Sequence, residues 1–336
     1  MASMDDGQLR TYLDRVGLDG PVPATAEGLK RVHHAQLDSI PYENVDIQLG
    51  VPLRLDVEGV HRKMVVERKG GFCYEQNVLL AAALRAMGFE VEYLKGAVGR
   101  AVDGDGEWFN HMPLLVGFGG RTVVADTGLG TGFRDPFPVE DGPLLQGQMI
   151  HHLSREDGAW RFRLDRRLTD QTFDFTTDPR GLDDFLPKFH ELQDSPESPF
   201  VKTLAVMKTG SRGVEMLRAR TLTVYRAGEG KRQGLVESRD DFAAELRGRF
   251  GLELSGERLA ALWDRAAEQH EAWRAEKGQS SRSLPEQSMP GTRTCAPPSA
   301  LPEVTREARR APVRRSPACR PGSTRSAGRA CGGWGR

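Results

Sequence analysis

The sequence predicts an α+β fold, because three kinds of residue pattern follow one another along the chain. Residues 1–90 carry apolar residues at helical spacing, and residues 91–195 change to the two-residue period of strands. Residues 196–276 mix the two patterns, and residues 277–336 have a different composition. We therefore expect a helical region, a small β-barrel, a mixed α/β region and a tail, in that order.

Residues 1–90 predict three helices. The first has apolar residues at helical spacing up to Gly17, and a second stripe of the same kind ends before Pro41. A third helix is expected to begin near Cys73, in a stretch rich in Leu and Ala. It should end at Gly88, since glycine commonly follows the last turn of a helix.

Residues 91–195 predict a mostly β domain. Apolar and polar residues alternate after Gly88, and the pair Gly119-Gly120 is typical of a two-residue hairpin turn. Strands are expected at residues 91–97, 111–118, 121–126, 160–164 and 171–175. Short strands of this kind, joined by tight turns, favour a small barrel.

Residues 196–276 predict both kinds of element. A strand is expected at Thr221–Tyr225. Ser238 has an acidic residue three positions later, which is typical of a helix N-cap, and it leads into residues 242–250. An amphipathic stripe from Leu259 to Trp273 predicts a long helix whose apolar face packs on the core.

Charge is unevenly distributed along the chain. With 47 Lys and Arg against 47 Asp and Glu the formal net charge is zero, which excludes a protein that binds nucleic acid over its whole surface. Residues 277–336 hold 12 of those cations and 3 of the anions, a net charge of +9, so residues 1–276 carry −9. The tail is poor in apolar residues, so we expect it to be disordered. We interpret this tail as a solvated extension without a role in the chemistry. The alternative is that its arginines form an RNA- or membrane-binding arm.

Cys73 is the only cysteine ahead of the tail, which holds Cys295, Cys319 and Cys331. The predicted folded part therefore has one thiol and no internal disulfide. The chain shows no charged-then-apolar leader and no apolar run near the ~20 residues that cross a bilayer. We expect a cytoplasmic protein without membrane or nucleic-acid partners.

Cys73 follows the pair Gly70-Gly71 at the predicted start of a helix. The thiolate is the nucleophile, and a free thiol with a pKa of about 8.5 is mostly protonated at pH 7. The positive end of a helix dipole, together with a histidinium, lowers the pKa of such a thiol and would make Cys73 a nucleophile. The alternative is that Cys73 is a small buried apolar residue, a common role for cysteine.

The predicted hairpin brings a histidine and a carboxylate together. If Gly119-Gly120 is a two-residue turn, Pro113 lies opposite Asp126. His111 then points to the same face as Asp126, as its diagonal neighbour at about 7–8 Å between backbones. A carboxylate that orients an imidazole beside a cysteine is the nucleophile–base–orienter arrangement. Taken singly, His111 is also typical of a half-buried strand residue, and Asp126 of a turn.

Other motifs predict no site. Gly128-Leu129-Gly130-Thr131-Gly132 follows a strand, as a phosphate-binding loop does, but Phe133 stands where a third glycine is needed, and two prolines prevent the following helix. The adjacent pairs His33-His34 and His151-His152 lack the spacing and the cysteine or carboxylate partners of a metal site. We expect no bound metal.

Five segments of residues 1–276 carry a family resemblance. They are Pro41–Asp46, Arg68–Asn77 with its Gly-Gly-x-Cys-x-Glu-x-Asn core, Asn110-His111, Ala125–Gly130 and Ser195–Phe200. Together they resemble the arylamine N-acetyltransferases. The resemblance implies a cysteine-protease-like core built of an N-terminal helical bundle, a β-barrel and a C-terminal α/β lid, and it does not extend to the tail.

The resemblance also implies an acyltransferase that works by a ping-pong mechanism. Cys73 would accept the acyl group, His111 would act as its base, and Asp126 would orient His111. The co-substrate would be acetyl-CoA or another acyl thioester, with no permanently bound cofactor, and the acceptor would be a small-molecule arylamine or hydrazine. The backbone N–H of Cys73, or one beside it, is a donor available to the oxyanion.

Leu129 stands where the family usually has an aromatic residue, and Lys69 where arginine is usual. Without that aromatic side chain the acyl pocket could take a larger acyl group. The related amide synthases of ansamycin biosynthesis use such a group. These close a macrolactam from a polyketide thioester, and the partner would be a polyketide synthase acyl carrier protein. Transglutaminase- and papain-like thiol hydrolases, with the same order of Cys, His and Asp or Asn, are a third reading. A catalytically inactive binding module is disfavoured, since all three positions are filled.

Overall fold

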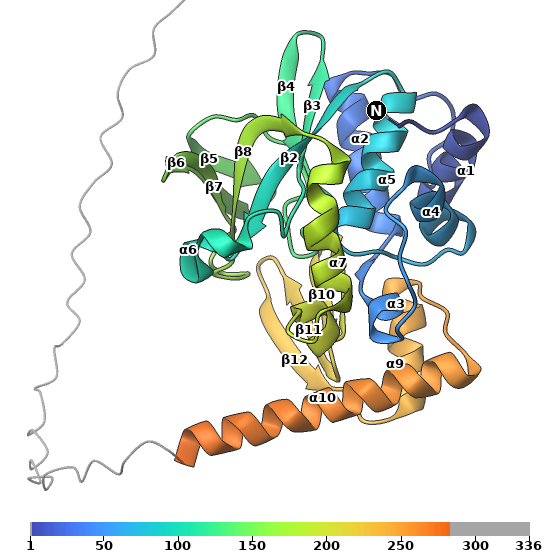
Figure 1. Ribbon diagram of the computed structural model, residues 1–336, viewed down its shortest axis with the longest axis vertical. Coiled ribbons are helices and arrows are strands. Elements are labelled where there is room, and N and C mark those ends of the chain that lie inside the picture. The colour runs from blue at the N-terminus through green and yellow to red at the C-terminus, as the bar shows by residue number, and fades with distance from the viewer. Residues whose placement is uncertain (1, 283–336) are drawn as a thin grey trace, which may run out of the picture. The chain divides into compact units, whose positions relative to one another are not determined.

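The computed structural model describes residues 2–282 (Figure 1). Two antiparallel sheets and the helices around them make up this part of the chain, so the predicted α+β class is confirmed. The last helix, α10 (Gly256–Arg282), continues past residue 277, where we expected the tail to begin. The rest of the predicted disordered tail lies outside the described residues.

Helices dominate the N-terminal part. They are α1 (Asp6–Val16), α2 (Ala26–Ser39), α3 (Val45–Gln48), α4 (Val57–His61) and α5 (Cys73–Ala86), with a π-type turn, η1 (Arg62–Val66), after α4. The three predicted helices correspond to α1, α2 and α5. Asp5 caps the start of α1 by accepting a hydrogen bond from the backbone N–H of Gln8 (2.8 Å), and Gly17, with a φ of 74°, caps its end. α5 begins at Cys73 as expected, and its residues as far as Leu84 are all buried, so it is the central helix of the core.

A seven-stranded sheet follows α5. Its strands lie in the order β4-β3-β2-β8-β7-β6-β5. Their bounds are β2 (Glu90–Val98), β3 (Leu114–Phe118), β4 (Arg121–Ala125), β5 (Gly142–Gln146), β6 (Met149–Glu156), β7 (Ala159–Arg163) and β8 (Thr172–Arg180). The sheet curls around buried side chains such as Phe137, Phe162 and Phe173, and it corresponds to the predicted barrel (Figure 1). β5 and β6 were not predicted from the sequence, because Pro143 and the adjacent histidines interrupt the apolar alternation there.

The predicted hairpin is confirmed. Phe118 of β3 faces Arg121 of β4, as a two-residue turn between them requires. Gly119 and Gly120 have φ values of 54° and 75°, which residues with a side chain rarely adopt. A turn with two positive φ angles matches the right-handed twist of the flanking strands, so this glycine pair fixes the register of β3 and β4.

A glycine in β2 allows the close approach of the segment that precedes β3. Gly96 forms an isolated antiparallel bridge with His111. A Cβ at Gly96 would lie 2.7 Å from the ring of Pro113 and 3.0 Å from the carbonyl oxygen of His111. No side chain fits in that space, so the position of His111 depends on a glycine in the neighbouring strand.

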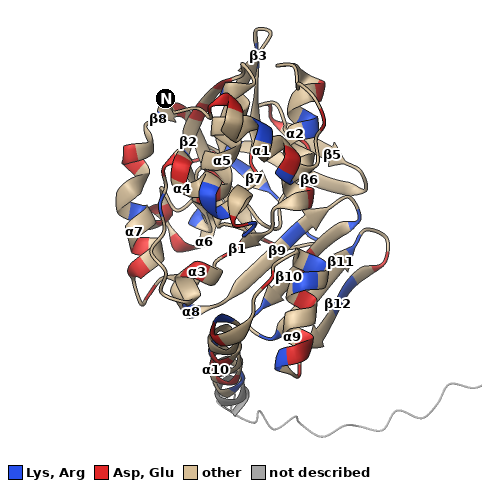
Figure 2. Cartoon of the chain, turned by 90° about the vertical axis from the view of Figure 1, so that its right-hand side faces the viewer, with Lys and Arg blue, Asp and Glu red and all other residues tan. Residues whose placement is uncertain are grey.

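A five-stranded sheet contains strands from both ends of the described chain. Its order is β1-β9-β10-β11-β12, with bounds β1 (Tyr42–Glu43), β9 (Ala205–Gly210), β10 (Gly213–Arg218), β11 (Thr221–Arg226) and β12 (Gly230–Leu235). β11 confirms the predicted strand. Tyr42 pairs with Met207, so β1 from the N-terminal part forms the edge beside β9 (Figure 2). This pairing was not predicted, because a strand of two residues has no period to read.

The remaining helices and turns lie between the strands and after them. They are α6 (Arg100–Asp103), α7 (Leu186–Asp194), α8 (Pro199–Lys202), α9 (Arg239–Glu245) and the single turns η2 (Asp105–Glu107), η3 (Leu182–Phe185) and η4 (Leu246–Phe250). α9 begins at the predicted N-cap, where the hydroxyl of Ser238 accepts a hydrogen bond from the N–H of Asp241 (3.1 Å). Leu262 and Ala266 of α10 belong to a buried cluster with residues of β9 and β10, as the amphipathic stripe predicted. No helix within residues 2–282 has the length and hydropathy needed to cross a bilayer.

Candidate active site

Cys73 is the first residue of α5 and has 3% of its surface exposed. Its thiol donates a hydrogen bond to the backbone carbonyl of Asn110 at 3.7 Å. Asn110 is fixed in turn by β2, because its side chain exchanges hydrogen bonds with the N–H (2.7 Å) and the carbonyl (2.9 Å) of Val98. The sulfur therefore lies against the segment that carries His111.

Burial raises the pKa of the Cys73 thiol well above its ordinary value, and the negative charge of Asp126 adds to the rise. The backbone N–H groups of Tyr74 and of Cys73 itself, at the start of α5, lower this pKa but are outweighed. We expected the helix start to lower the pKa of the Cys73 thiol, and for the net pKa this expectation is wrong. Burial removes the water that would solvate a thiolate, and this effect is the larger one. Ionisation of this sulfur needs a neighbouring group that takes its proton.

His111 and Asp126 are in contact, as the hairpin predicted. Nε2 of His111 lies 2.5 Å from a carboxylate oxygen of Asp126, and both side chains are buried. The carboxylate of Asp126 therefore contacts Nε2 of the His111 ring and does not contact Nδ1. Among the described residues, the hydrogen bond of the Cys73 thiol goes to Asn110 and not to the imidazole. The structure thus joins His111 and Asp126 directly and places Cys73 against the residue that precedes His111.

Asp126 is held by three neighbouring residues besides His111. Nδ2 of Asn77 and the backbone N–H of Gly128 each donate to one carboxylate oxygen at 2.7 Å. The backbone N–H of Asp126 donates to Nε2 of His33 at 3.1 Å. Burial alone would raise the pKa of Asp126, but His111 and the two donors outweigh it, and the net pKa lies below its usual value. Asp126 is therefore a carboxylate at neutral pH.

Gly128 packs directly on the start of α5. A Cβ at this position would lie 2.5 Å from the carbonyl oxygen and 2.8 Å from Cα of Cys73. Any side chain would push the loop that carries Asp126 away from α5, so a glycine is required where the loop and the helix meet. The backbone N–H of Thr127 donates to the side chain of Asn77 at 3.0 Å, which adds a second link between them.

Buried polar residues that the sequence analysis missed connect α2 to the same loop. Nε2 of Gln36 donates to the hydroxyl of Thr127 (2.8 Å) and to the backbone carbonyl of Gln76 (2.9 Å). The hydroxyl of Tyr12 donates to the side chain of Gln36 at 2.8 Å. Asn77 belongs to the cysteine motif, but the sequence indicated no role for its side chain. The position of Gln36 could have been noticed in the sequence, because it is a polar residue in an otherwise apolar helical stripe.

A buried cluster of charges supports the entry to α5. Nζ of Lys63 lies 2.8 and 2.9 Å from the carboxylate oxygens of Glu75, and it is 3.9 Å from Glu43 and 3.8 Å from Asp46. Burial raises the pKa of Glu75 and Lys63 lowers it, and the resulting pKa is about 7. Glu75 also accepts a hydrogen bond from the N–H of Phe72 (3.2 Å). The cluster therefore fixes the residue immediately before Cys73.

The two histidine pairs do not converge on a common site. His33 faces the backbone of Asp126, whereas Nε2 of His34 lies 2.6 Å from the carboxylate of Asp135. The pair His151-His152 has one buried and one exposed side chain. Within residues 2–282 no group of three or more His, Cys, Asp or Glu side chains is arranged to hold a metal ion.

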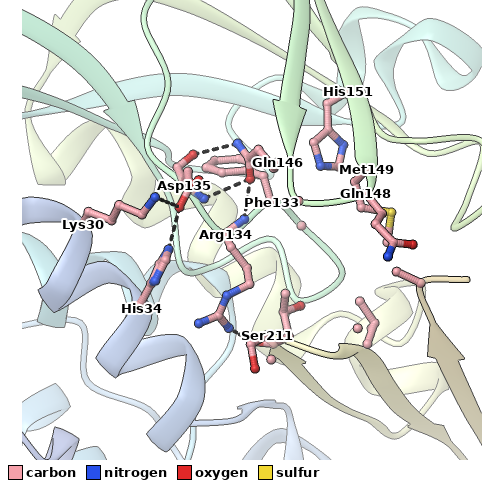
Figure 3. A pocket seen from close by; sticks show the side chains of 17 residues that line it. Lys30, His34, Phe133, Arg134, Asp135, Gln146, Gln148, Met149, His151 and Ser211 are labelled. Atoms are coloured by element: carbon pink, nitrogen blue, oxygen red, sulfur yellow. Dashed lines mark hydrogen bonds and ion pairs between the residues drawn. The ribbon is translucent and has the colours of Figure 1, made fainter.

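A pocket of about 250 Å³ lies between α2, the loop after β4 and the turns of the β5–β6 and β9–β10 hairpins. Figure 3 shows Lys30 and His34 pointing at Asp135, whose carboxylate lies 3.1 Å from the lysine nitrogen. Arg134 forms two hydrogen bonds with Asp38, of 2.7 and 2.8 Å. The positively charged side chains of Lys30 and Arg134 in this pocket are therefore paired with carboxylates. One side of the pocket is formed by residues that follow Asp126 in the same loop.

Comparison with known proteins identifies the family. The N-acetyltransferase family model matches residues 25–259. An arylamine N-acetyltransferase of Mycolicibacterium smegmatis is 34% identical over 266 residues, which cover 72% of this chain and 91% of the relative. The chain belongs to the arylamine N-acetyltransferase family. Arylamine N-acetyltransferase 1 of Bos taurus is 30% identical over 253 residues, which cover 67% of this chain and 86% of the relative.

Solved structures of arylamine N-acetyltransferases share the fold described above. The enzyme of M. smegmatis has a TM-score of 0.70 and 31% identity, and the match covers 78% of this chain and 98% of that one. The Mycobacterium marinum arylamine N-acetyltransferase, solved in complex with CoA, has a TM-score of 0.71 and 28% identity over 77% of this chain and 98% of that one. Membership of the arylamine N-acetyltransferase family makes this chain an acyltransferase.

The buried ring of His33 predicts a loss of stability in acid. Burial, together with the neighbouring His34, lowers the pKa of His33 to about 4, against about 6.5 for an unfolded histidine. Between these values the unfolded chain binds a proton that the folded chain does not. The free energy of unfolding should therefore fall as pH is lowered from about 6.5 to 4, by about 3 kcal/mol from this residue. His33→Gln, which keeps an acceptor for the N–H of Asp126, should flatten that dependence.

Chemical denaturation at several pH values between 7 and 4 measures the effect. His152→Gln is the matched control, because His152 is exposed, and this variant should follow the wild type. Equal losses of stability in the wild type and in the His33→Gln variant would contradict the assignment of His33 as a neutral acceptor.

Proposed function

We propose that this chain moves an acyl group from a thioester to an arylamine nitrogen through an acyl-enzyme on Cys73. The observation that carries the proposal is the buried pair of His111 and Asp126, 2.5 Å apart, next to the residue that binds the thiol at the start of α5. A nucleophile, a base and a group that orients the base are the parts that covalent acyl transfer needs.

The first step is a proton transfer. Burial keeps Cys73 protonated, so the proton must leave with a partner. The Nδ1 atom of His111 takes the thiol proton, and Asp126 at Nε2 stabilises the imidazolium that forms. The resulting thiolate and imidazolium neutralise each other, which removes most of the unfavourable energy of a lone buried charge.

Acyl transfer then proceeds in two half-reactions. The sulfur of Cys73 attacks the thioester carbonyl, and the carrier thiolate leaves with the proton held by His111. The amine nitrogen next attacks the carbonyl of the acyl-enzyme, and His111 takes the proton that the nitrogen loses while the Cys73 sulfur departs. Because a thioester is exchanged for a thioester, the first half-reaction is close to isoenergetic. The protein therefore has to supply the thiolate and stabilise the oxyanion.

The family suggests the substrates. A relative from M. marinum was solved with CoA, and the matching relatives are arylamine N-acetyltransferases. We take acetyl-CoA as the acyl donor, used as a co-substrate, and a small arylamine as the acceptor. Transfer to an amine is favoured over a thiol hydrolase, because the family model and the relatives named above are transferases.

Cys73 should carry the acyl group. After incubation with acetyl-CoA, intact-mass analysis should show a single added acetyl group on the wild type and none on the Cys73→Ala variant. Replacing Cys295, Cys319 and Cys331 together by serine is the control, and that variant should still acquire the acetyl group. An acetyl group retained by Cys73→Ala, or lost in the triple variant, would contradict the nucleophile assignment.

A larger acyl group is the second candidate. Leu129 stands where an aromatic residue is usual in the family, and it packs in the cluster that includes Phe133 and Phe137. We propose that this smaller side chain leaves room beside the acyl group. An amide synthase that closes an ansamycin-type macrolactam, from a polyketide thioester presented by an acyl carrier protein, would need such room. Both functions use the same chemistry at Cys73.

Leu129→Phe should narrow the acyl site. Acylation of Cys73 by a long-chain acyl-CoA should slow by about tenfold, because a side chain that fills the space excludes the chain. Acylation by acetyl-CoA should change little. Single-turnover rates with the two donors measure the ratio, and Leu145→Phe, at an exposed site of β5, is the control. An unchanged ratio would show that Leu129 does not set acyl size.

A further inference from the structure

Tyr42 lies where the start of α5 meets the five-stranded sheet. Its backbone pairs with Gly71 on one side and with Met207 of β9 on the other. Gly71 precedes Cys73 by two residues, so the pairing ties Tyr42 to the segment that leads into α5. This placement follows from main-chain pairing and is fixed independently of what the side chain does.

The loop after Asp126 touches both Cys73 and Tyr42. Gly128 packs on the backbone of Cys73, and a Cβ on Gly130 would lie 3.3 Å from Cγ of Tyr42. Two residues span at most about 7 Å of chain, so the tyrosine ring and the start of α5 lie against one short segment. The side chain of Tyr42 therefore borders the candidate active site.

The hydroxyl of Tyr42 has no hydrogen-bond partner among the described residues, and its oxygen keeps some contact with solvent, although only 8% of the residue is exposed. The chain has five tyrosines, and the other four all have one: Tyr12 donates to Gln36, Tyr74 to the carbonyl of Phe109, Tyr93 accepts from Arg85, and Tyr225 contacts the sulfur of Met149. With no protein partner, the O–H group of Tyr42 is available to donate to a partner that arrives with the substrate.

The surroundings of Tyr42 determine what that partner is. Burial raises the pKa of Tyr42 well above its ordinary value, and the charges of Cys73 and Asp126 raise it further. The hydroxyl therefore stays protonated throughout the reaction. Since an amine nucleophile must keep its lone pair for attack, the acceptor left for this O–H group is the carbonyl oxygen of the acyl group.

We propose that Tyr42 is a catalytic residue whose hydroxyl donates a hydrogen bond to the carbonyl oxygen of the acyl group as Cys73 is acylated. The proposal rests on the acyl-enzyme proposed above. When the sulfur of Cys73 attacks, the carbonyl π pair moves onto oxygen, and the O–H of Tyr42 donates to the oxyanion without transferring its proton. The bond weakens as the carbonyl re-forms and the carrier thiolate leaves with the proton held by His111, so its effect is largest in the transition state.

Tyr42→Phe tests the proposal, because it keeps the ring and removes only the hydroxyl. With p-nitrophenyl acetate as the acyl donor, the single-turnover rate of acylation should fall by about 10²–10³, the usual loss for one oxyanion donor. Alkylation of Cys73 by iodoacetamide at the same pH, followed on the peptide that contains Cys73, should stay within about twofold, since no carbonyl oxygen is stabilised in that reaction. Tyr225→Phe, which alters a buried tyrosine of β11, is the control and should change neither rate.

Three outcomes would overturn the proposal. An unchanged acylation rate in Tyr42→Phe would show that the hydroxyl contacts no reacting atom. A parallel fall in alkylation would show that it acts on the thiolate instead. A melting temperature below that of the wild type would show that the hydroxyl already has a partner in the resting protein. Failure of the wild type itself to form an acyl adduct would instead reject the proposed function, and the two failures are therefore distinguishable.

Discussion

The fixed position of the Asp126 carboxylate is the constraint on which the rest of the site depends. Hydrogen bonds from Asn77 and from the N–H of Gly128 hold one carboxylate oxygen, and the ring of His111 lies 2.5 Å from the other. Three elements that are distant in the sequence, α2, α5 and the β3–β4 hairpin, meet at this residue. Because the carboxylate is buried and its partners are fixed, the imidazole has one orientation, with Nδ1 free for the thiol proton.

The opposing effects on Cys73 show how the site is balanced. The two N–H groups at the start of α5 favour a thiolate, whereas burial and the charge of Asp126 favour the thiol. The second pair of effects is larger, so Cys73 stays protonated. A charge appears on the sulfur only together with a charge on His111. Burial therefore couples nucleophile and base, and it also excludes the water that would otherwise compete with an amine for the acyl group.

Local patterns in the sequence predicted the parts of the fold and site that local rules determine. The glycine pair at 119–120 fixed the register of the hairpin, and the register placed His111 beside Asp126. The helix start at Cys73 followed from the same kind of signal. The two-residue strand that carries Tyr42 and the buried hydrogen bonds of Gln36 depend on contacts between distant segments, so no period or motif revealed them. The raised pKa of Cys73 depends on burial, which spacing alone does not specify.

The pH dependence of Cys73 alkylation in the wild type and in Asp126→Asn tests whether the Asp126 carboxylate, acting through His111, makes the Cys73 thiol reactive. The substitution keeps the shape of the side chain and removes the charge that stabilises an imidazolium. With iodoacetamide at pH 6, modification of the Cys73 peptide should be at least about tenfold slower in Asp126→Asn than in the wild type. Asp135→Asn, which alters the carboxylate paired with His34, should behave as the wild type. Superimposable rate profiles for Asp126→Asn and the wild type would contradict the account.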